Sequence, residues 1–180
     1  MHTRSLVILL VAIGCLLLSA QDWKQVHKAD DARFAKETGL DPLLIHRMWR
    51  MASQSPNERD DASRIEKIDT DSLAERHQIL LVTYAGENNC RTVTVFRRLG
   101  ETNLTKIWSE SKTPEGQGFC DNAFANGKVR SREGAVQVYV PQIPSGHSQD
   151  APFLVYSYEW NGVSYRFASK DLAGPRPPQE

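Results

Sequence analysis

Two cysteines in the body of the chain carry the chemistry that the sequence indicates most clearly. Cys90 and Cys120 are not arranged as C-x-x-C, the spacing typical of a redox-active dithiol. A third cysteine, Cys15, lies within an apolar run near the start of the chain. Two cysteines in an oxidising compartment most simply form one disulfide. We therefore predict a structural Cys90–Cys120 disulfide.

The histidines and carboxylates form no recognisable catalytic or metal-binding motif. Beyond the first twenty residues the histidines are His27, His46, His77 and His147. None belongs to an H-E-x-x-H motif, and neighbouring carboxylates such as Asp69 and Asp71 fit helix caps and solvated loops better than a cleft. The chain also lacks a G-x-S-x-G motif and a phosphate-binding glycine loop. We predict no metal and no cofactor, and we favour a non-enzymatic protein while leaving the enzyme class open.

Aromatic residues are the candidate binding residues. The glycine-containing stretch between Glu110 and Gly127 carries Phe119 directly before Cys120, so a disulfide would fasten this loop. Near the C-terminus, three more rings share one face of a predicted hairpin: Tyr158, Trp160 and Tyr165. If exposed, such rings could stack on sugar rings or on a partner surface. The alternative is that they belong to the core, where aromatic faces are more common.

The first twenty residues have the layout of a secretory signal peptide. Arg4 supplies a positive charge, and an apolar run from Leu6 to Leu18 precedes the small residues Ser19 and Ala20. The run is short for a membrane span. We therefore predict cleavage after Ala20, a periplasmic or secreted mature chain and no membrane span within it.

Cys15 allows a second interpretation of the same segment. The string Ala12-Ile13-Gly14-Cys15 is similar to a bacterial lipobox, in which the cysteine becomes the lipidated first residue. The apolar stretch before Cys15 would be short, and three leucines would follow the anchor. Cleavage after Ala20 fits the whole run better, so a lipid anchor at Cys15 remains the alternative.

The N-terminal third contains one segment that resembles a DNA-binding element. Residues 34–50 are similar to the helix-turn-helix of bacterial regulators, with Ala35, Gly39, Ile45 and Met48 at the small, turn and packing positions. Export would place this segment across the membrane from the genome. The chain has a formal net charge of zero, which gives no electrostatic reason to expect nucleic acid or an anionic membrane. We therefore predict a packed helical hairpin and no nucleic-acid partner.

Hydrophobic periodicity divides the remainder into helices and strands. Helical spacing runs from Gln21 to about Gln54, with a stop at Gly39 and a cap at Asp41. Alternating apolar residues predict six strands, over residues 79–84, 92–97, 104–108, 135–140, 153–160 and 163–167. The fold class is therefore α+β: an N-terminal helical hairpin followed by a mostly antiparallel β-sheet of about six strands.

The last two strands are joined by the strongest turn signal in the chain. Asn161-Gly162 favours a two-residue type I′ turn, in which both central residues have positive φ. That turn would place Trp160 opposite Val163, Tyr158 opposite Tyr165 and Tyr156 opposite Phe167. The expected register puts all these rings on one face of the sheet.

These expectations give a domain plan and a general function. The plan is a signal peptide (1–20), a helical N-terminal segment (21–77), an antiparallel β region packed with the helices as one domain (78–172) and a disordered tail (173–180). Export, the stapled loop and the missing catalytic motifs favour a small binding domain for an envelope protein or glycan. The alternative is a small hydrolase that acts on cell-envelope material.

Overall fold

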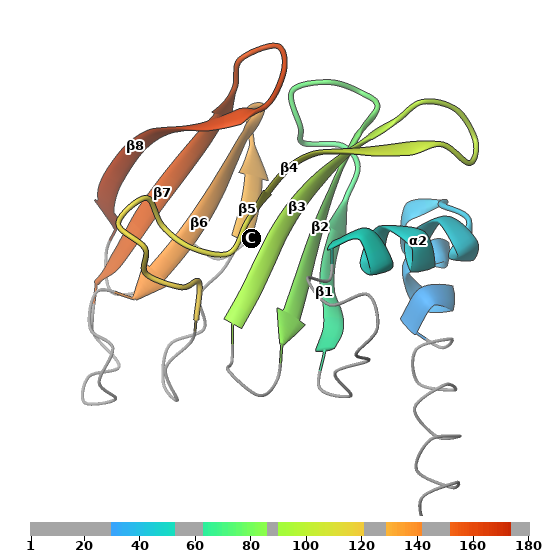
Figure 1. Cartoon of the computed structure of the whole chain (residues 1–180), viewed down its shortest axis with the longest axis horizontal. Coiled ribbons are helices and arrows are strands. Elements are labelled where there is room, and N and C mark those ends of the chain that lie inside the picture. The colour runs from blue at the N-terminus through green and yellow to red at the C-terminus, as the bar shows by residue number, and fades with distance from the viewer. Residues whose placement is uncertain (1–29, 53–62, 86–89, 121–128, 142–151, 174–180) are drawn as a thin grey trace, which may run out of the picture.

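The computed structural model describes residues 30–52, 63–85, 90–120, 129–141 and 152–173. The predicted signal peptide and Cys15 lie outside these residues. Two helical segments precede eight β-strands, which form two antiparallel four-stranded sheets (Figure 1). The α+β class is confirmed, whereas the expectation of about six strands in a single sheet is wrong.

Each strand pairs with the next strand along the chain within its sheet. The first sheet contains β1 (Ser63–Asp69), β2 (Gln78–Ala85), β3 (Cys90–Arg98) and β4 (Leu104–Glu110). The second sheet contains β5 (Val129–Arg132), β6 (Ala135–Pro141), β7 (Phe153–Trp160) and β8 (Tyr165–Ala173). This order needs only hairpin-like connections inside each sheet, which suits antiparallel strands.

The molecule has three layers, and the first sheet lies in the middle (Figure 1). One apolar cluster joins the helices to the outer face of the first sheet and includes Ile45, Met48, Leu81 and Phe96. A second, larger cluster fills the space between the two sheets. A sheet in the middle layer needs apolar residues on both faces, so β2 reads as the continuous apolar run ILLV rather than as an alternating strand.

The helical hairpin follows the expected local signals. Gly39 has φ +69° and donates its amide to the Ala35 carbonyl, as a glycine at a helix end does. Helix α2 (Pro42–Ala52) begins after Asp41, whose carboxylate accepts a hydrogen bond of 2.7 Å from the Leu43 amide. The predicted stop and cap are therefore confirmed, and the helix begins with its proline in the first turn.

The two strands missed by the sequence pattern are β1 and β5. In β1 a bulge at Glu66 shifts the register, so Ile65 and Ile68 both face the helices although they are three residues apart. That spacing hides the period of two on which strand prediction depends. Strand β5 is four residues long, and Val129 is its one apolar residue. Neither strand could be recognised from alternation.

The register of the β7–β8 hairpin differs from the expected one. Trp160 pairs with Tyr165 and Tyr158 pairs with Phe167, so the connection has four residues instead of two. The Asn161 carboxamide oxygen accepts the amides of Val163 and Ser164, and this side-chain turn replaces the type I′ turn. The shift of two residues leaves these rings on the predicted face, because the side-chain period is also two.

A turn with the type I′ signature occurs instead between β5 and β6. Glu133 has φ +51° and Gly134 has φ +83°, and the flanking residues Arg132 and Ala135 pair directly. A Cβ on Gly134 would lie 3.3 Å from the Cα of Ala74, so the second sheet approaches the segment after β1 closely here. Tertiary contact thus selects a turn that the residue pair Glu-Gly does not favour by itself.

The Cys90–Cys120 disulfide is present, as predicted. It joins the start of β3 to the end of the loop that follows β4. Beside it, the Arg91 amide donates to the Phe119 carbonyl at 2.9 Å. The buried Arg91 guanidinium also forms a two-point ion pair with Glu66 on β1, with 2.8 Å between Nη2 and Oε1. This end of the first sheet is therefore held by covalent, backbone and charged contacts together.

Removing the disulfide should weaken the fold without changing its architecture. Replacing both cysteines by serine (C90S and C120S) should lower the free energy of unfolding by about 2–4 kcal/mol. The disulfide closes a loop between cysteines 30 residues apart, and without it the unfolded chain regains conformational entropy. Urea denaturation of both proteins measures this change. Thiol labelling of the native protein without reductant should find no reaction at Cys90 or Cys120, and two reactive thiols there would contradict the assignment.

The β5–β6 turn should respond in opposite directions to two substitutions. Glu133→Asn should raise the free energy of unfolding by about 0.5–1 kcal/mol, because asparagine tolerates positive φ better than glutamate. Gly134→Ala should lower it by at least about 1 kcal/mol, since φ is +83° and Ala74 leaves little room for a Cβ. Denaturation midpoints test both changes, and a destabilising Glu133→Asn would show that the turn is not strained.

Candidate functional site

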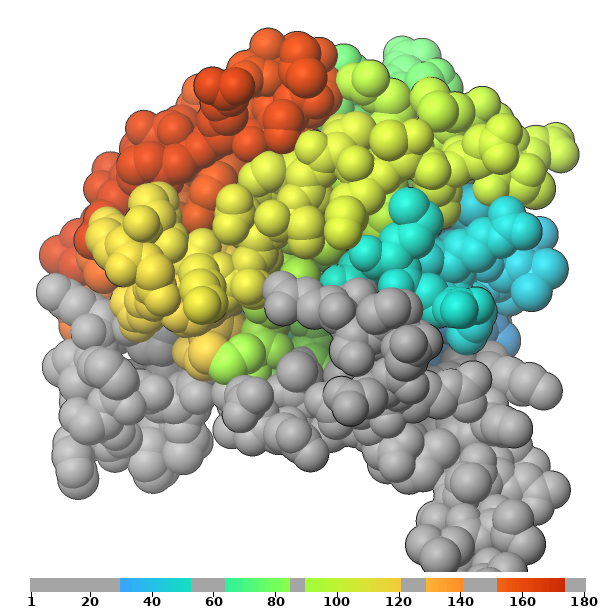
Figure 2. All heavy atoms as spheres, viewed as in Figure 1, coloured from blue at the N-terminus to red at the C-terminus, as the bar shows by residue number. Residues whose placement is uncertain are grey.

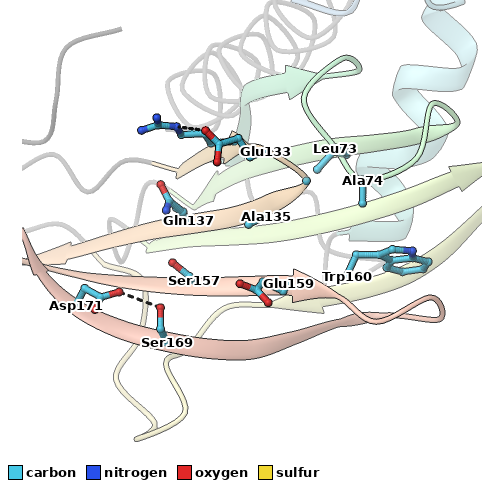
Figure 3. A pocket seen from close by; sticks show the side chains of 12 residues that line it. Leu73, Ala74, Glu133, Ala135, Gln137, Ser157, Glu159, Trp160, Ser169 and Asp171 are labelled. Atoms are coloured by element: carbon cyan, nitrogen blue, oxygen red, sulfur yellow. Dashed lines mark hydrogen bonds and ion pairs between the residues drawn. The ribbon is translucent and has the colours of Figure 1, made fainter.

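A shallow groove lies on the face of the second sheet that points away from the first sheet (Figure 3). It encloses about 850 Å³. Strands β6, β7 and β8 supply the floor, and the β5–β6 turn with the segment after β1 supplies one wall. The polar residues of the floor are Gln137, Ser157, Glu159, Ser169 and Asp171.

The polar floor residues of the groove alternate along the strands with apolar residues that point into the core. Along β7, Tyr156 and Tyr158 point into the core between the sheets. Ser157 and Glu159 alternate with these tyrosines and therefore face outward, as successive residues of a strand do. The sequence Y-S-Y-E-W thus builds one side of the core and the floor of the groove at the same time.

Ser157 is the most informative residue of the floor. It is only 8% exposed, and its hydroxyl has no hydrogen-bond partner among the described residues. The side chain points into the groove, between Gln137 and Glu159 in the view of Figure 3. Among the described residues, the buried side-chain polar atoms that lack a partner belong to Gln78, Arg97, Arg130 and Tyr158. The Ser157 hydroxyl is not one of these enclosed groups and is open to the groove. The hydroxyl is therefore available to a molecule that enters the groove.

Each carboxylate of the groove has a hydrogen-bond donor or a guanidinium group beside it. The Asp171 carboxylate accepts a hydrogen bond of 2.9 Å from the Ser169 hydroxyl. Glu159 lies directly opposite Arg166 of β8 in the strand register. At the rim, the Glu133 carboxylate lies 3.2 Å from the guanidinium of Arg132. These three carboxylates are exposed and act as solvated hydrogen-bond acceptors, and Arg132 is the one cationic side chain beside them in the lining, which is therefore acidic.

Trp160 is held in place at one end of the groove. Its indole nitrogen donates to a Glu75 carboxylate oxygen at 3.1 Å, and the Arg97 guanidinium binds the other oxygen at 3.0 Å. The same guanidinium lies 5.3 Å from the indole ring, a distance typical of a cation–π contact. The ring is fixed from two sides and forms a rigid end wall.

Most of the predicted binding rings lie in the core. Phe119, Tyr158 and Tyr165 are buried between the sheets, and Trp108 contacts both tyrosines with ring centroids 5.0 and 5.7 Å apart. In this structure their rings are not at a surface where a ligand could stack on them. Of the four candidates, Trp160 alone lines the groove, and it is partly buried. Their role in binding remains a prediction.

The loop that carries Phe119 is fastened to the second sheet. Glu115 at its tip forms an ion pair of 2.9 Å with Lys170 of β8. The hydrogen bond from Lys170 lowers the pKa of the Glu115 carboxyl to about 2. Cys120 ties the other end of the loop through the disulfide. The loop thus lies against β8 and helps to close the core, while the groove lies on the other face of that sheet.

Two features are not found among the described residues. In the part of the chain that the structure describes, no three histidine, cysteine or acidic side chains converge to hold a metal ion. No helix within the described ranges has the length and apolarity needed to cross a membrane.

The sequence predicts which face of the sheet the groove residues occupy, but it does not predict that this face forms a groove. Hairpin periodicity places Ser157 and Glu159 on the face opposite the rings, which the structure confirms. Nothing local marks this face as concave, because the walls come from distant segments at Leu73 and Glu133. Comparisons of the chain with protein-family models, with curated proteins and with solved structures found no match.

Proposed function

We propose that this chain is an exported binding protein and that the groove of its second sheet binds a neutral glycan of the cell envelope. The predicted signal peptide supports export. The unpartnered Ser157 hydroxyl on the groove floor carries the argument for binding. A hydroxyl in this position gains a hydrogen bond when a polar ligand replaces solvent.

The chemistry of the floor favours a sugar over an anionic or apolar ligand. Gln137 offers a carboxamide, Ser157 a hydroxyl and Asp171 a carboxylate, which together can both donate to and accept from sugar hydroxyls. Three carboxylates against the single guanidinium of Arg132 make the lining acidic, which disfavours an anionic ligand. An apolar partner surface would need an apolar centre, whereas the larger apolar residues of this groove, Leu73 and Trp160, lie in its walls and not on the floor.

The same groups favour binding over hydrolysis. Glycoside hydrolysis commonly needs one carboxyl group that stays protonated because of burial or a neighbouring charge. Glu133, Glu159 and Asp171 are all exposed to solvent, so none of them has the burial on which such a group commonly depends. The groove therefore suits a receptor for glycans better than the small hydrolase that was the alternative.

A pair of serine substitutions tests the proposal. Ser157→Ala should weaken binding of soluble, uncharged N-acetylglucosamine oligosaccharides by about 5–10-fold while the melting temperature stays unchanged, because its hydroxyl has no partner among the described residues. Ser164→Ala is the matched control, since the Ser164 hydroxyl donates to the Ile107 carbonyl at 3.0 Å. That variant should lose about 1 kcal/mol of stability and keep its affinity. Calorimetric titration and thermal denaturation measure the two effects.

Three results would contradict the proposal. Wild-type protein that fails to bind these uncharged oligosaccharides would exclude this class of ligand. Equal affinity of the wild type and Ser157→Ala would move the binding site away from the groove. Release of new reducing ends during incubation would show that the protein is a hydrolase.

A further inference from the structure

A second surface, made by α2 and the β3–β4 hairpin, combines exposed apolar residues with basic residues. Leu43 on the first turn of α2 is 70% exposed, Met51 on its last turn is 39% exposed, and Leu99 in the hairpin connection is 62% exposed. Around them lie Arg47 and Lys106, both exposed. Helix and hairpin lie side by side in both views (Figure 1, Figure 2). We call this the helix–hairpin surface.

Direct contacts hold the two elements of this surface together. The Arg47 guanidinium donates to the Thr102 carbonyl at 3.2 Å. The Lys106 ammonium donates to the Met51 carbonyl at 3.3 Å, close to the C-terminal end of α2. The apolar and basic side chains are therefore presented by one fixed unit and not by independent elements.

The positive charge of this surface is not neutralised by ion pairs. Arg47, Lys106 and the neighbouring Arg98 bond to backbone carbonyls, and none of the three forms an ion pair with a described carboxylate. The carboxylates on the same elements are Glu101 and Glu110 of the hairpin and Asp41, which caps α2. Basic side chains outnumber acidic ones on these elements, although the whole chain has a net charge of zero.

We propose that the helix–hairpin surface binds the surface of an anionic lipid bilayer. Separate apolar side chains surrounded by long basic side chains match the pattern of membrane-surface binding, in which the apolar tips enter the acyl boundary and the cations contact headgroups. A protein interface would instead place its apolar residues in one contiguous, buried centre. Here Leu43, Met51 and Leu99 lie at separate points of the two elements.

The position of this surface in the fold agrees with the proposal. It lies on the helical side of the molecule, and the groove lies on the outer face of the second sheet, beyond the middle layer. A bilayer bound here would leave the groove open on the far side.

Vesicle sedimentation of the chain from Gln21 onward, which keeps every described residue, tests the proposal. We expect binding to vesicles that contain phosphatidylglycerol, weaker binding to pure phosphatidylcholine vesicles, and a loss of binding at high salt. Arg47→Glu combined with Lys106→Glu should reduce the partition coefficient by at least about tenfold. Leu99→Ser should reduce it by about fivefold, because one apolar tip no longer enters the acyl boundary.

Two controls separate this effect from misfolding and from general charge. Arg47→Lys with Lys106→Arg should keep the wild-type partition coefficient. Arg166→Glu with Leu172→Ser removes an exposed arginine and an exposed leucine from β8 and should leave vesicle binding unchanged. Thermal denaturation followed by circular dichroism shows that each variant is folded at the temperature of the vesicle assay.

Several outcomes would overturn the proposal without affecting the glycan site. One is that the wild type does not bind anionic vesicles, and another is that the charge-reversal variant binds them as well as the wild type does. A third is that Leu99→Ser binds as well as the wild type, which would indicate a non-specific attraction to polyanions. A photo-crosslinker at Leu99 that captures a protein in intact cells, together with no vesicle binding, would identify a protein interface instead. Glycan titration of the same variants distinguishes failure of this proposal from failure of the groove.

Discussion

Burial of the aromatic face of the second sheet against the first sheet is the constraint on which the rest of the structure depends. Tyr156, Tyr158 and Tyr165 lie in this core, where Trp108 of the first sheet packs on two of them. Aromatic side chains bury large areas, so this packing fixes which face of β6, β7 and β8 is inside. The other face must then point outward, and its polar part becomes the floor of the groove, on the same face as the apolar cluster of Tyr139, Phe153 and Val155.

The same packing gives the two proposed binding surfaces their rigidity and their separation. The floor of the groove consists of strand residues, and its end wall is fixed through the contacts of Glu75 with Trp160 and Arg97. Ligand sites on rigid elements keep their geometry better than sites on loops. On the other side, the helical hairpin and the β3–β4 hairpin belong to a different apolar cluster. A membrane contact there would not disturb the groove.

Sequence reasoning succeeded where local physical chemistry decides the outcome. The stop at Gly39, the cap at Asp41 and the disulfide follow from backbone freedom, hydrogen bonding and cysteine pairing. It failed where tertiary contacts override local preference. The bulge in β1 breaks the alternation, and the positive φ angles fall at Glu133 and Gly134 instead of at the favoured Asn161-Gly162 pair. The missed turn depends on contact with Ala74, which lies far away in the sequence.

The amino-acid sequence by itself determined the α+β class and the face on which Tyr156 to Trp160 lie, because both depend on hydrophobic periodicity. It also determined the disulfide partners, because only two cysteines remain beyond the first twenty residues. Only the tertiary structure decided that the strands form two sheets, that the rings are core, and that a concave groove lies over Ser157. It also gathered Arg47, Lys106 and Leu99 on one surface of a chain with no net charge. The groove and the basic surface are each built from segments that are distant in sequence. Overall composition and net charge are averages over the whole chain and do not show such local features.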